Sequence, residues 1–195
     1  MRNIYTLAAV LSVMILVIAC SEQKQEIIIK DKGPVANPTE LRIYQIAAVG
    51  KSVKGKPADF SWSDGSHTVN FSDVTKGKVV LLNFWATWCG PCRAEIPDII
   101  QISRSMESKG VIVIGVALER GKDANLNMSK VKTYAEKQNI PYINIIGNQS
   151  IVEAYGGIGS IPQTLIIDKA GRIAETMVGT KTKEEFMESI NRAMK

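Results

Sequence analysis

The chain has 195 residues, of which 45% are hydrophobic and 22% are charged, a composition typical of one globular domain with a short additional segment. Its formal net charge is +5, and the basic residues are scattered among acidic ones without a block of like charge. This pattern excludes a disordered or fibrous protein and indicates neither nucleic-acid binding nor a polybasic membrane patch. Three cysteines are too few for a disulfide framework, and two of them are three residues apart.

Residues 1–19 have the pattern of a secretory signal peptide. Arg2 supplies a positive start, and residues 4–18 form an apolar run that is short for a membrane-spanning helix. The run ends in Ala19-Cys20, which resembles the bacterial lipobox, where a small residue precedes a cysteine that is lipidated and becomes the new N-terminus. The sequence therefore predicts a domain that works outside the cytoplasm and is held on a membrane by lipidated Cys20. A plain cleaved signal and an uncleaved anchor are the alternatives.

Residues 20–52 are expected to form a tether between the anchor and the domain. They combine charged residues with Pro34 and Pro38, and have only short apolar patches. The patch at residues 41–49 is compatible with linker and equally with an additional strand or helix of the domain.

Strands and helices alternate in the remaining chain. Asp64-Gly65 between residues 60–62 and 68–71 predicts a β-hairpin with a tight turn. Residues 78–85 form the near-continuous apolar run of a strand buried on both faces, and a helix pattern follows from Pro91 to Gly110. Further strands are predicted over residues 111–118, 142–146, 163–168 and 172–178, and further helices over residues 127–138, 150–155 and 182–193. This order predicts an α/β fold with a mixed central sheet and helices on both faces.

Cys89 and Cys92 lie at the start of the predicted helix and one turn inside it. Unpaired backbone N–H groups and the positive end of the helix dipole stabilise a thiolate there, and only a thiolate attacks a disulfide. Cys89 is expected to be the exposed nucleophile, and Cys92 is close enough to attack the mixed disulfide and release the product. Gly90 lets a partner backbone approach, and Pro91 fixes φ without losing a hydrogen bond.

Other roles for the cysteine pair fit the sequence less well. A zinc site needs four ligands, and only Cys20 and His67 remain as candidates. Attachment of a c-type haem needs a histidine where Arg93 stands. Two inert structural cysteines would not need a Gly-Pro bridge at a helix start. The pair is therefore predicted to be redox-active, with no metal and no cofactor.

The residues around the pair carry a family resemblance. The run WCGPC at residues 88–92, with NFWA at residues 83–86 and Glu95 after it, resembles the thioredoxin superfamily. More narrowly, it is similar to the TlpA/ResA-like thiol-disulfide oxidoreductases, whose upstream Gly-Lys-x-Ala-x-Asp-Phe run is echoed at residues 55–60. The resemblance covers about residues 53–195 and implies a thioredoxin-like fold with an N-terminal β-hairpin extension and a central insertion.

The resemblance also implies site residues beyond the two cysteines. It implies a cis peptide bond at Pro162, which would leave the Ile161 backbone free to pair with a bound peptide next to Cys89. Trp88 is expected to be a platform edge against which substrate packs.

One residue departs from the thioredoxin pattern. Thioredoxin carries a buried aspartate where this chain has Asn83, which cannot titrate, so the usual proton acceptor for Cys92 is missing. Glu95, one turn beyond Cys92, and Glu119, at the end of the strand over residues 111–118, are the candidates to replace it. A solvated surface glutamate is the alternative for each.

The family implies an exported enzyme that acts on cysteines of other proteins. The Gly-Pro bridge is that of thioredoxin, whose potential is about −270 mV, which favours reduction of client disulfides. The implied partners are apocytochromes c or other exported cysteine proteins, and an integral membrane protein that donates thiol electrons to this monomer. A peroxiredoxin-type peroxidase would need threonine at Ala86, and a copper-binding assembly factor would need a histidine downstream of the cysteines, where the sequence has none.

Overall fold

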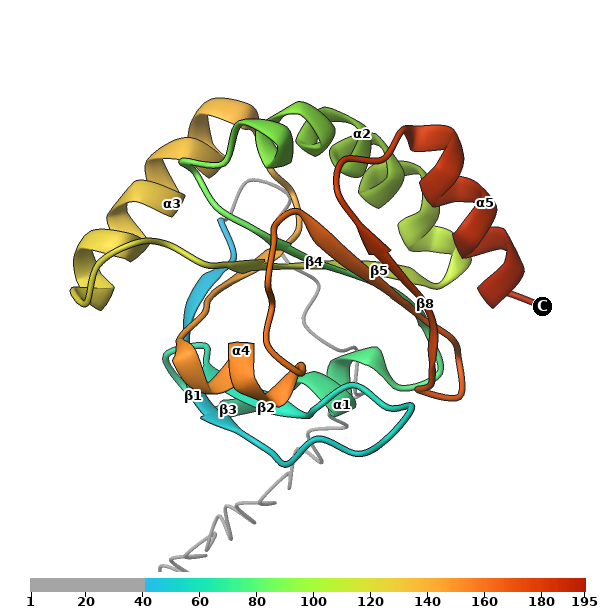
Figure 1. The fold of residues 1–195 in the computed structure, drawn as a ribbon, viewed down its shortest axis with the longest axis horizontal. Helices are drawn as coiled ribbons and strands as arrows, with labels where there is room; N and C mark the ends of the chain where they lie inside the picture. Colours follow the sequence, from blue (N-terminus) through green and yellow to red (C-terminus); the bar gives the residue numbers. More distant parts are fainter. Residues whose placement is uncertain (1–40) are drawn as a thin grey trace, which may run out of the picture. The chain divides into compact units, whose positions relative to one another are not determined.

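The computed structural model describes residues 41–195, which form a mixed sheet of eight strands (Figure 1). In chain order the strands are β1 (Ile43–Val49), β2 (Phe60–Ser63), β3 (Thr68–Asn70), β4 (Val79–Trp85), β5 (Val111–Ala117), β6 (Ile143–Ile146), β7 (Gln163–Ile167) and β8 (Ile173–Val178). Their order across the sheet is β3-β2-β1-β6-β5-β4-β7-β8. The pairs β1–β6, β6–β5 and β5–β4 are parallel and the others are antiparallel, so the predicted mixed sheet is confirmed.

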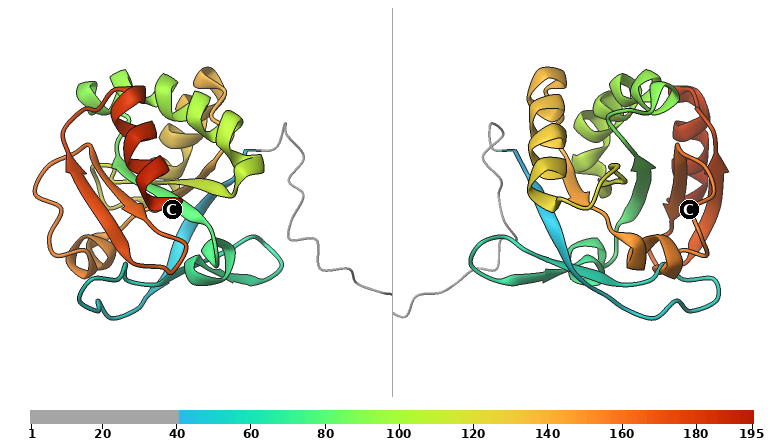
Figure 2. Two further views of the ribbon diagram at one scale, coloured as in Figure 1. Left: turned by 90° about the vertical axis from the view of Figure 1, so that its right-hand side faces the viewer. Right: turned by 60° about the vertical axis from the view of Figure 1, so that its left-hand side comes forward.

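Helices cover both faces of this sheet. They are α1 (Phe71–Thr75), α2 (Gly90–Met106), the 3₁₀ turn η1 (Glu107–Lys109), α3 (Ala124–Gln138), α4 (Gln149–Ala154) and α5 (Lys183–Ala193). Figures 1 and 2 show α2, α3 and α5 over one face, with α1 and α4 at the other. The two-faced arrangement predicted from the alternating pattern is therefore confirmed.

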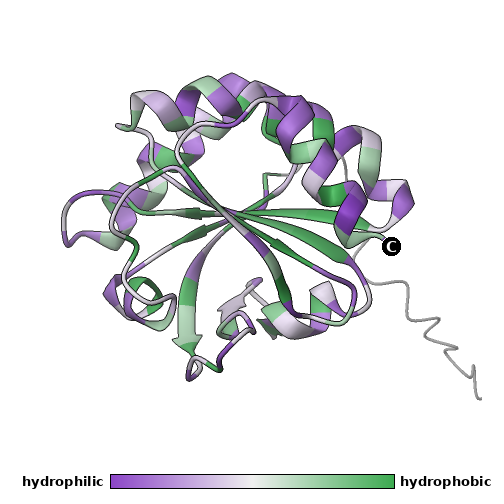
Figure 3. Ribbon diagram, turned by 45° about the vertical axis from the view of Figure 1, so that its right-hand side comes forward, coloured by the Kyte–Doolittle hydropathy of each residue, from purple (hydrophilic) through white to green (hydrophobic). Residues whose placement is uncertain are grey.

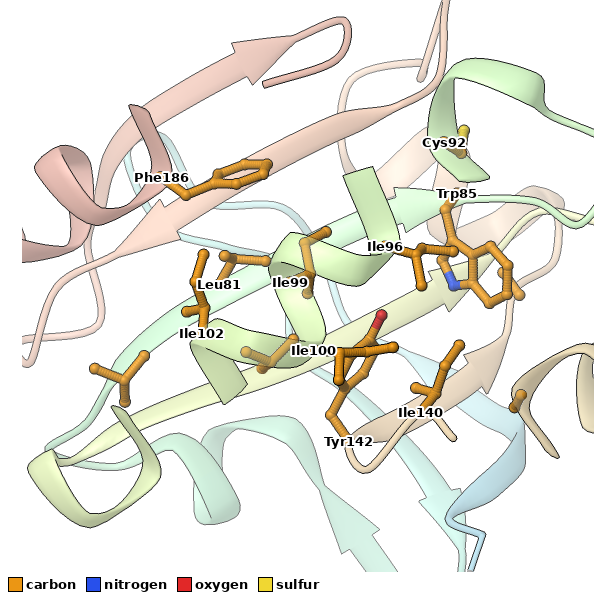
Figure 4. Close-up of a cluster of buried hydrophobic side chains, with 14 of the residues drawn as sticks. Leu81, Trp85, Cys92, Ile96, Ile99, Ile100, Ile102, Ile140, Tyr142 and Phe186 are labelled. Atoms are coloured by element: carbon orange, nitrogen blue, oxygen red, sulfur yellow. The ribbon is translucent and has the colours of Figure 1, made fainter. Parts of the chain in front are cut away.

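Strand β4 lies at the centre of the core, and all seven of its residues are buried. Side chains alternate across a strand, so Leu81 and Trp85 pack under α2 while Leu82 and Phe84 pack into the opposite cluster. Figure 3 shows the apolar strands in the interior and polar stripes on the outer helix faces. Figure 4 shows the side chains between α2 and the sheet, with Cys92 above Trp85 at one end of the cluster. Cys92 is thus built onto the most deeply packed part of the fold.

The apolar patch at residues 41–49, which was compatible with a linker or with an additional strand or helix, contains strand β1. The strand pairs in parallel with β6 and antiparallel with β2, so the linker expected to reach residue 52 ends earlier and residues 43–49 belong to the sheet. The β1 side chains are half-buried or exposed, and the strand is fixed mainly by backbone pairing with partners on both sides.

Among the element boundaries that differ from prediction, two have a cause in the contacts of the structure. Strand β3 stops at Asn70 and Phe71 begins helix α1, because the Phe71 ring is buried and stacks on Phe60 with ring centroids 4.8 Å apart. Helix α3 begins three residues before residue 127, because the Asp123 carboxylate accepts the first backbone N–H groups of the helix.

The predicted signal peptide and Cys20 lie outside the described residues. Within residues 41–195, no helix has both the length and the apolar character needed to cross a bilayer.

Candidate active site

Helix α2 carries both cysteines at its N-terminus. Cys89 is the N-cap, with extended backbone at φ −84° and ψ 107°, and Gly90 and Pro91 occupy the first two helical positions. The two sulfurs form a disulfide with an S–S distance of 2.08 Å, and the backbone N–H of Cys92 donates to Cys89 Sγ at 3.2 Å. The Cys89 sulfur thus takes the place of a capping side chain at the positive end of the helix, where a thiolate is stabilised.

The two sulfurs differ in access. Cys92 is completely buried and Cys89 is 4% exposed, so Cys89 is the more accessible of the two, as predicted, but it is much less exposed than expected. Part of its cover is the carbonyl oxygen of Ile161, which lies 3.7 Å from Cys89 Sγ. The Ile161 backbone thus lies next to the more accessible sulfur.

The loop before β7 has the backbone that the family resemblance implied. The Ile161–Pro162 peptide bond is cis, Pro162 is buried and Ile161 is half-buried. The Pro162 carbonyl oxygen accepts a hydrogen bond of 2.9 Å from the backbone N–H of Gly179. This loop, which carries the Ile161 carbonyl beside Cys89, is thus tied to the end of β8; pairing of Ile161 with a bound peptide stays a prediction.

Glu95 lies beneath the first turns of α2 in a buried polar group. It is 1% exposed, so the alternative of a solvated surface glutamate is wrong for this residue. Asn83 Nδ2 donates to Glu95 Oε1 at 2.8 Å and also to Thr164 Oγ1 at 2.9 Å, while the backbone N–H of Lys181 donates to Glu95 Oε2 at 3.2 Å. Burial raises the pKa of Glu95 to about 7, and the hydrogen bonds from Lys181 and Asn83 act in the opposite direction. Glu95 therefore changes its charge near neutral pH, as a proton acceptor for Cys92 must.

Asn83 thus stands at the thioredoxin aspartate position without titrating. Its two amide hydrogen bonds link β4, α2 and β7, and its Oδ1 is buried with no partner among the described groups. Thr164 was not predicted as part of the site. It lies directly opposite Asn83 in the antiparallel β4–β7 pairing, and only that register brings the two residues together.

Trp85 is locked in place beneath the cysteine pair by a close approach of two strands. Its Nε1 donates to Asn144 Oδ1 at 3.0 Å, above Gly115 of β5. A Cβ at Gly115 would collide with the Asn144 side chain and would lie 2.9 Å from Trp85 Nε1. Glycine is therefore required at Gly115, and Trp85 is a core residue, as predicted.

Glu119 lies elsewhere, in the loop that follows β5. Its carboxylate accepts the backbone N–H of Thr87 at 2.6 Å and the Thr87 hydroxyl at 3.0 Å. These bonds hold the loop that leads into Cys89, and none of them reaches the buried group around Glu95. The structure thus places Glu119 as a support for the active-site loop rather than beneath Cys92. Thr87 was missed because the sequence gives no sign of its partner 32 residues away.

Trp88 is an exposed aromatic surface next to Cys89. It is 44% exposed, and the guanidinium of Arg120 lies 3.9 Å from its ring centroid. Arg93, on the outer face of α2, lies over the Tyr134 ring at 5.9 Å. The surface around Cys89 thus combines an apolar platform with cationic groups. In the part of the chain that the structure describes, no group of three His, Cys, Asp or Glu side chains is arranged to hold a metal ion.

The chain matches a family model and known proteins along most of the described residues. A model described as the AhpC/TSA family matches residues 53–176. The thiol-disulfide oxidoreductase ResA of Bacillus anthracis is 35% identical over 112 residues, which cover 57% of this chain and 61% of that protein. The thioredoxin-like protein YneN of Bacillus subtilis is 31% identical over 148 residues, which cover 76% of this chain and 84% of that protein. The chain thus spans about three-fifths of the length of that ResA protein.

Solved structures agree in fold. A thiol:disulfide interchange protein of the thioredoxin family from Chlorobium tepidum has a TM-score of 0.58 and 28% identity, covering 79% of this chain and 97% of that one. The exposed lipoprotein thioredoxin Etrx1 of Streptococcus pneumoniae has a TM-score of 0.57 and 28% identity, covering 69% of this chain and 99% of that one. The predicted thioredoxin-like fold is confirmed.

Proposed function

The chain belongs to the AhpC/TSA family, and we propose that it is a thiol-disulfide oxidoreductase that acts on cysteines of exported client proteins. The observation that carries the proposal is the Cys89–Cys92 disulfide at the N-terminus of α2, with the carbonyl oxygen of Ile161 3.7 Å from Cys89 Sγ. A disulfide at the positive end of a helix and beside an accessible backbone has the features that thiol-disulfide exchange requires.

The exchange begins from the reduced dithiol. The Cys89 thiolate attacks one sulfur of the client disulfide, whose S–S bond breaks, and the second client sulfur leaves as a thiolate that takes up a proton. The Cys92 thiolate then attacks Cys89 Sγ, the mixed disulfide breaks, and the client departs with both thiols after a second protonation. Two electrons have passed to the client, and the protein holds the Cys89–Cys92 disulfide of the structure.

Glu95 accepts the proton that Cys92 loses before the second attack. It lies one helical turn beyond Cys92, and both residues are on the buried face of α2. A pKa of about 7 lets this carboxyl take up and return a proton at neutral pH, which the neutral amide of Asn83 cannot do. Glu119 supports the loop before Cys89 and takes no part in this proton transfer.

The proposed setting is the outer side of a membrane. The lipobox-like Ala19-Cys20 and the similarity to Etrx1, described as an exposed lipoprotein, support a lipid anchor at Cys20. The Gly90–Pro91 bridge favours transfer of electrons from this protein to client disulfides. The family resemblance implies apocytochromes c as clients of a monomeric enzyme and an integral membrane thiol protein as its electron donor.

Trapping of the mixed disulfide tests the exchange. Cys92→Ser removes the second attacking thiol, so exported proteins should accumulate covalently on Cys89 and be released by dithiothreitol. Cys89→Ser is the matched control, which should trap nothing and should lose insulin-disulfide reduction, measured as the turbidity of the precipitating B chain. Retained insulin reduction by Cys89→Ser, or an absence of trapped protein on Cys92→Ser, would contradict the assigned roles.

Substitution of the lipidated cysteine tests the anchor separately. Cys20→Ala should move the protein from the membrane fraction to the soluble extracytoplasmic fraction, because one covalent lipid is then missing. Insulin reduction by the released protein should be unchanged, since Cys20 takes no part in the exchange. Residues 1–19 would be identified as an uncleaved anchor if membrane association continued and mass spectrometry found these residues still attached in the unsubstituted protein.

A further inference from the structure

The segment of residues 179–181, between β8 and α5, contacts two separate parts of the active site. The backbone N–H of Gly179 donates to the Pro162 carbonyl oxygen at 2.9 Å, which ties the segment to the loop beside Cys89. The hydroxyl of Thr180 donates to the carbonyl oxygen of Pro91 at 3.4 Å, in the first turn of α2. No motif in the sequence points to this segment, which lies almost ninety residues after the cysteine pair.

The same segment also reaches the buried carboxylate. The Lys181 backbone N–H donates to Glu95 Oε2, and Asn83 Nδ2 holds Glu95 Oε1 from the opposite strand. The positive charge of Lys181 lowers the pKa of Glu95, whereas the negative charge of Asp98 on α2 raises it. Tyr142, buried below α2, also interacts electrostatically with Glu95. Lys181 thus provides the single positive charge among these groups.

We propose that residues 179–181 are a positioning segment that holds the loop beside Cys89 at Pro162, the first turn of α2 at Pro91 and the Glu95 carboxylate in a fixed relative arrangement. The inference rests on the proposed role of Glu95 and adds the segment that positions the Glu95 carboxylate. Three consecutive residues each make one hydrogen bond to a different part of the site, so a shift of the segment displaces all three parts together. Errors of this kind in the placement of reacting groups slow a reaction strongly.

Two glycines provide a matched test of the segment's backbone. Gly179 has φ +78° and Gly171, in the turn between β7 and β8, has φ +73°, and a Cβ at either position meets nothing within 4 Å. Gly179→Ala and Gly171→Ala should therefore suffer a similar fall in thermal midpoint. Only Gly179→Ala should slow resolution of the mixed disulfide, by about 10-fold, and change its pH profile. The readout is the second release of thionitrobenzoate after the reduced protein reacts with Ellman's reagent. Equal effects of both substitutions on this step would overturn the proposal.

A pair of lysines tests the link to the carboxylate. The acid limb of the pH profile is the range in which the rate of mixed-disulfide resolution falls as pH decreases. Lys181→Met removes the charge beside Glu95 and should move this limb to higher pH by about half a unit. Lys183→Met removes the same charge two residues on, where Lys183 Nζ bonds Gln101, and should leave the profile in place.

A third substitution separates this proposal from the one on which it rests. If Glu95→Gln leaves the acid limb unchanged, the proposed role of Glu95 is wrong. If Glu95→Gln removes the limb while Gly179→Ala and Lys181→Met leave it in place, Glu95 keeps its role and the positioning segment is wrong.

Discussion

The interior beneath α2 and the loop after β5 each contribute one glutamate to the active-site region, in opposite environments. Glu95 is 1% exposed and receives only neutral donors, the Asn83 amide and the Lys181 backbone N–H. Glu119 is half-buried and receives a short bond of 2.6 Å from the Thr87 backbone and a second from the Thr87 hydroxyl. The sequence offered these two carboxyls for one role, and the structure places them in different surroundings.

The difference shows what decides the role of a carboxyl near a thiol. Burial makes ionisation expensive and raises the pKa of Glu95 to about 7, although the charge of Lys181 and the hydrogen bonds to the carboxylate act in the opposite direction. A carboxylate that accepts two hydrogen bonds from one residue instead fixes the conformation of that residue. Glu119 fixes Thr87, two residues before Cys89, and acts on the nucleophile only through the loop.

The largest expected effect comes from Glu95→Gln. This change keeps the size and polarity of the side chain but removes its ability to accept a proton. Resolution of the Cys89 mixed disulfide at pH 7 should slow by about 100-fold, because a positioned base is lost. Stopped-flow measurement of the second thionitrobenzoate release between pH 5 and pH 9 should also show that the acid limb disappears. Glu119→Gln is the control and should keep that limb. If Glu119→Gln lost the limb and Glu95→Gln kept it, the two roles would have to be exchanged.

The same buried carboxyl should weaken the fold as pH rises. The pKa of Glu95 is about 7 in the native protein against 4.5 ordinarily, so between these values the native state holds a proton that the unfolded state has lost. Stability is therefore lost as pH rises through this window. At about 1.4 kcal/mol per pK unit, the oxidised protein should lose roughly 2–3 kcal/mol of unfolding free energy from this group between pH 5 and pH 8. Urea unfolding of Glu95→Gln should show a smaller loss over the same range, since all other groups titrate alike in both proteins. An equal loss in the two proteins would show that Glu95 keeps its ordinary pKa.

Much of the fold could be predicted because its signals are local. The apolar run of β4 and the helix start at Pro91 depend on neighbouring residues alone. Strand β1 is different. Its pairing with β6 joins Ile43 to Asn144, so it depends on chain that is about a hundred residues away and on little burial of its own. A short apolar patch cannot reveal such a partner.

The residues of the candidate site also divide into those with local sequence signals and those that depend on distant parts of the chain. The cysteine pair is readable from its spacing, and the cis bond before Pro162 from the family resemblance. The surroundings of Glu95 are not, because they arise where β4, β7 and the segment of residues 179–181 converge. Thr164 joins the site through the strand register, and Lys181 through a bond that spans 86 residues of sequence. Sequence reasoning could offer Glu95 as a candidate, but its burial comes from tertiary packing.

The smallest expected effect concerns Glu119, the glutamate in the loop after β5. Glu119→Gln removes the charge from two hydrogen bonds to Thr87 while keeping an acceptor in place, so the unfolding free energy should fall by about 1 kcal/mol. Insulin reduction should fall only a few-fold, because Cys89 and Glu95 are untouched. Thr87→Val removes the hydroxyl bond alone, and the double variant should destabilise by less than the sum of the single changes, since both act on one contact. Strict additivity in urea unfolding would show that the Glu119 charge does not strengthen the bond to the Thr87 hydroxyl. In that event the carboxylate of Glu119 would hold the loop before Cys89 through the Thr87 backbone N–H alone.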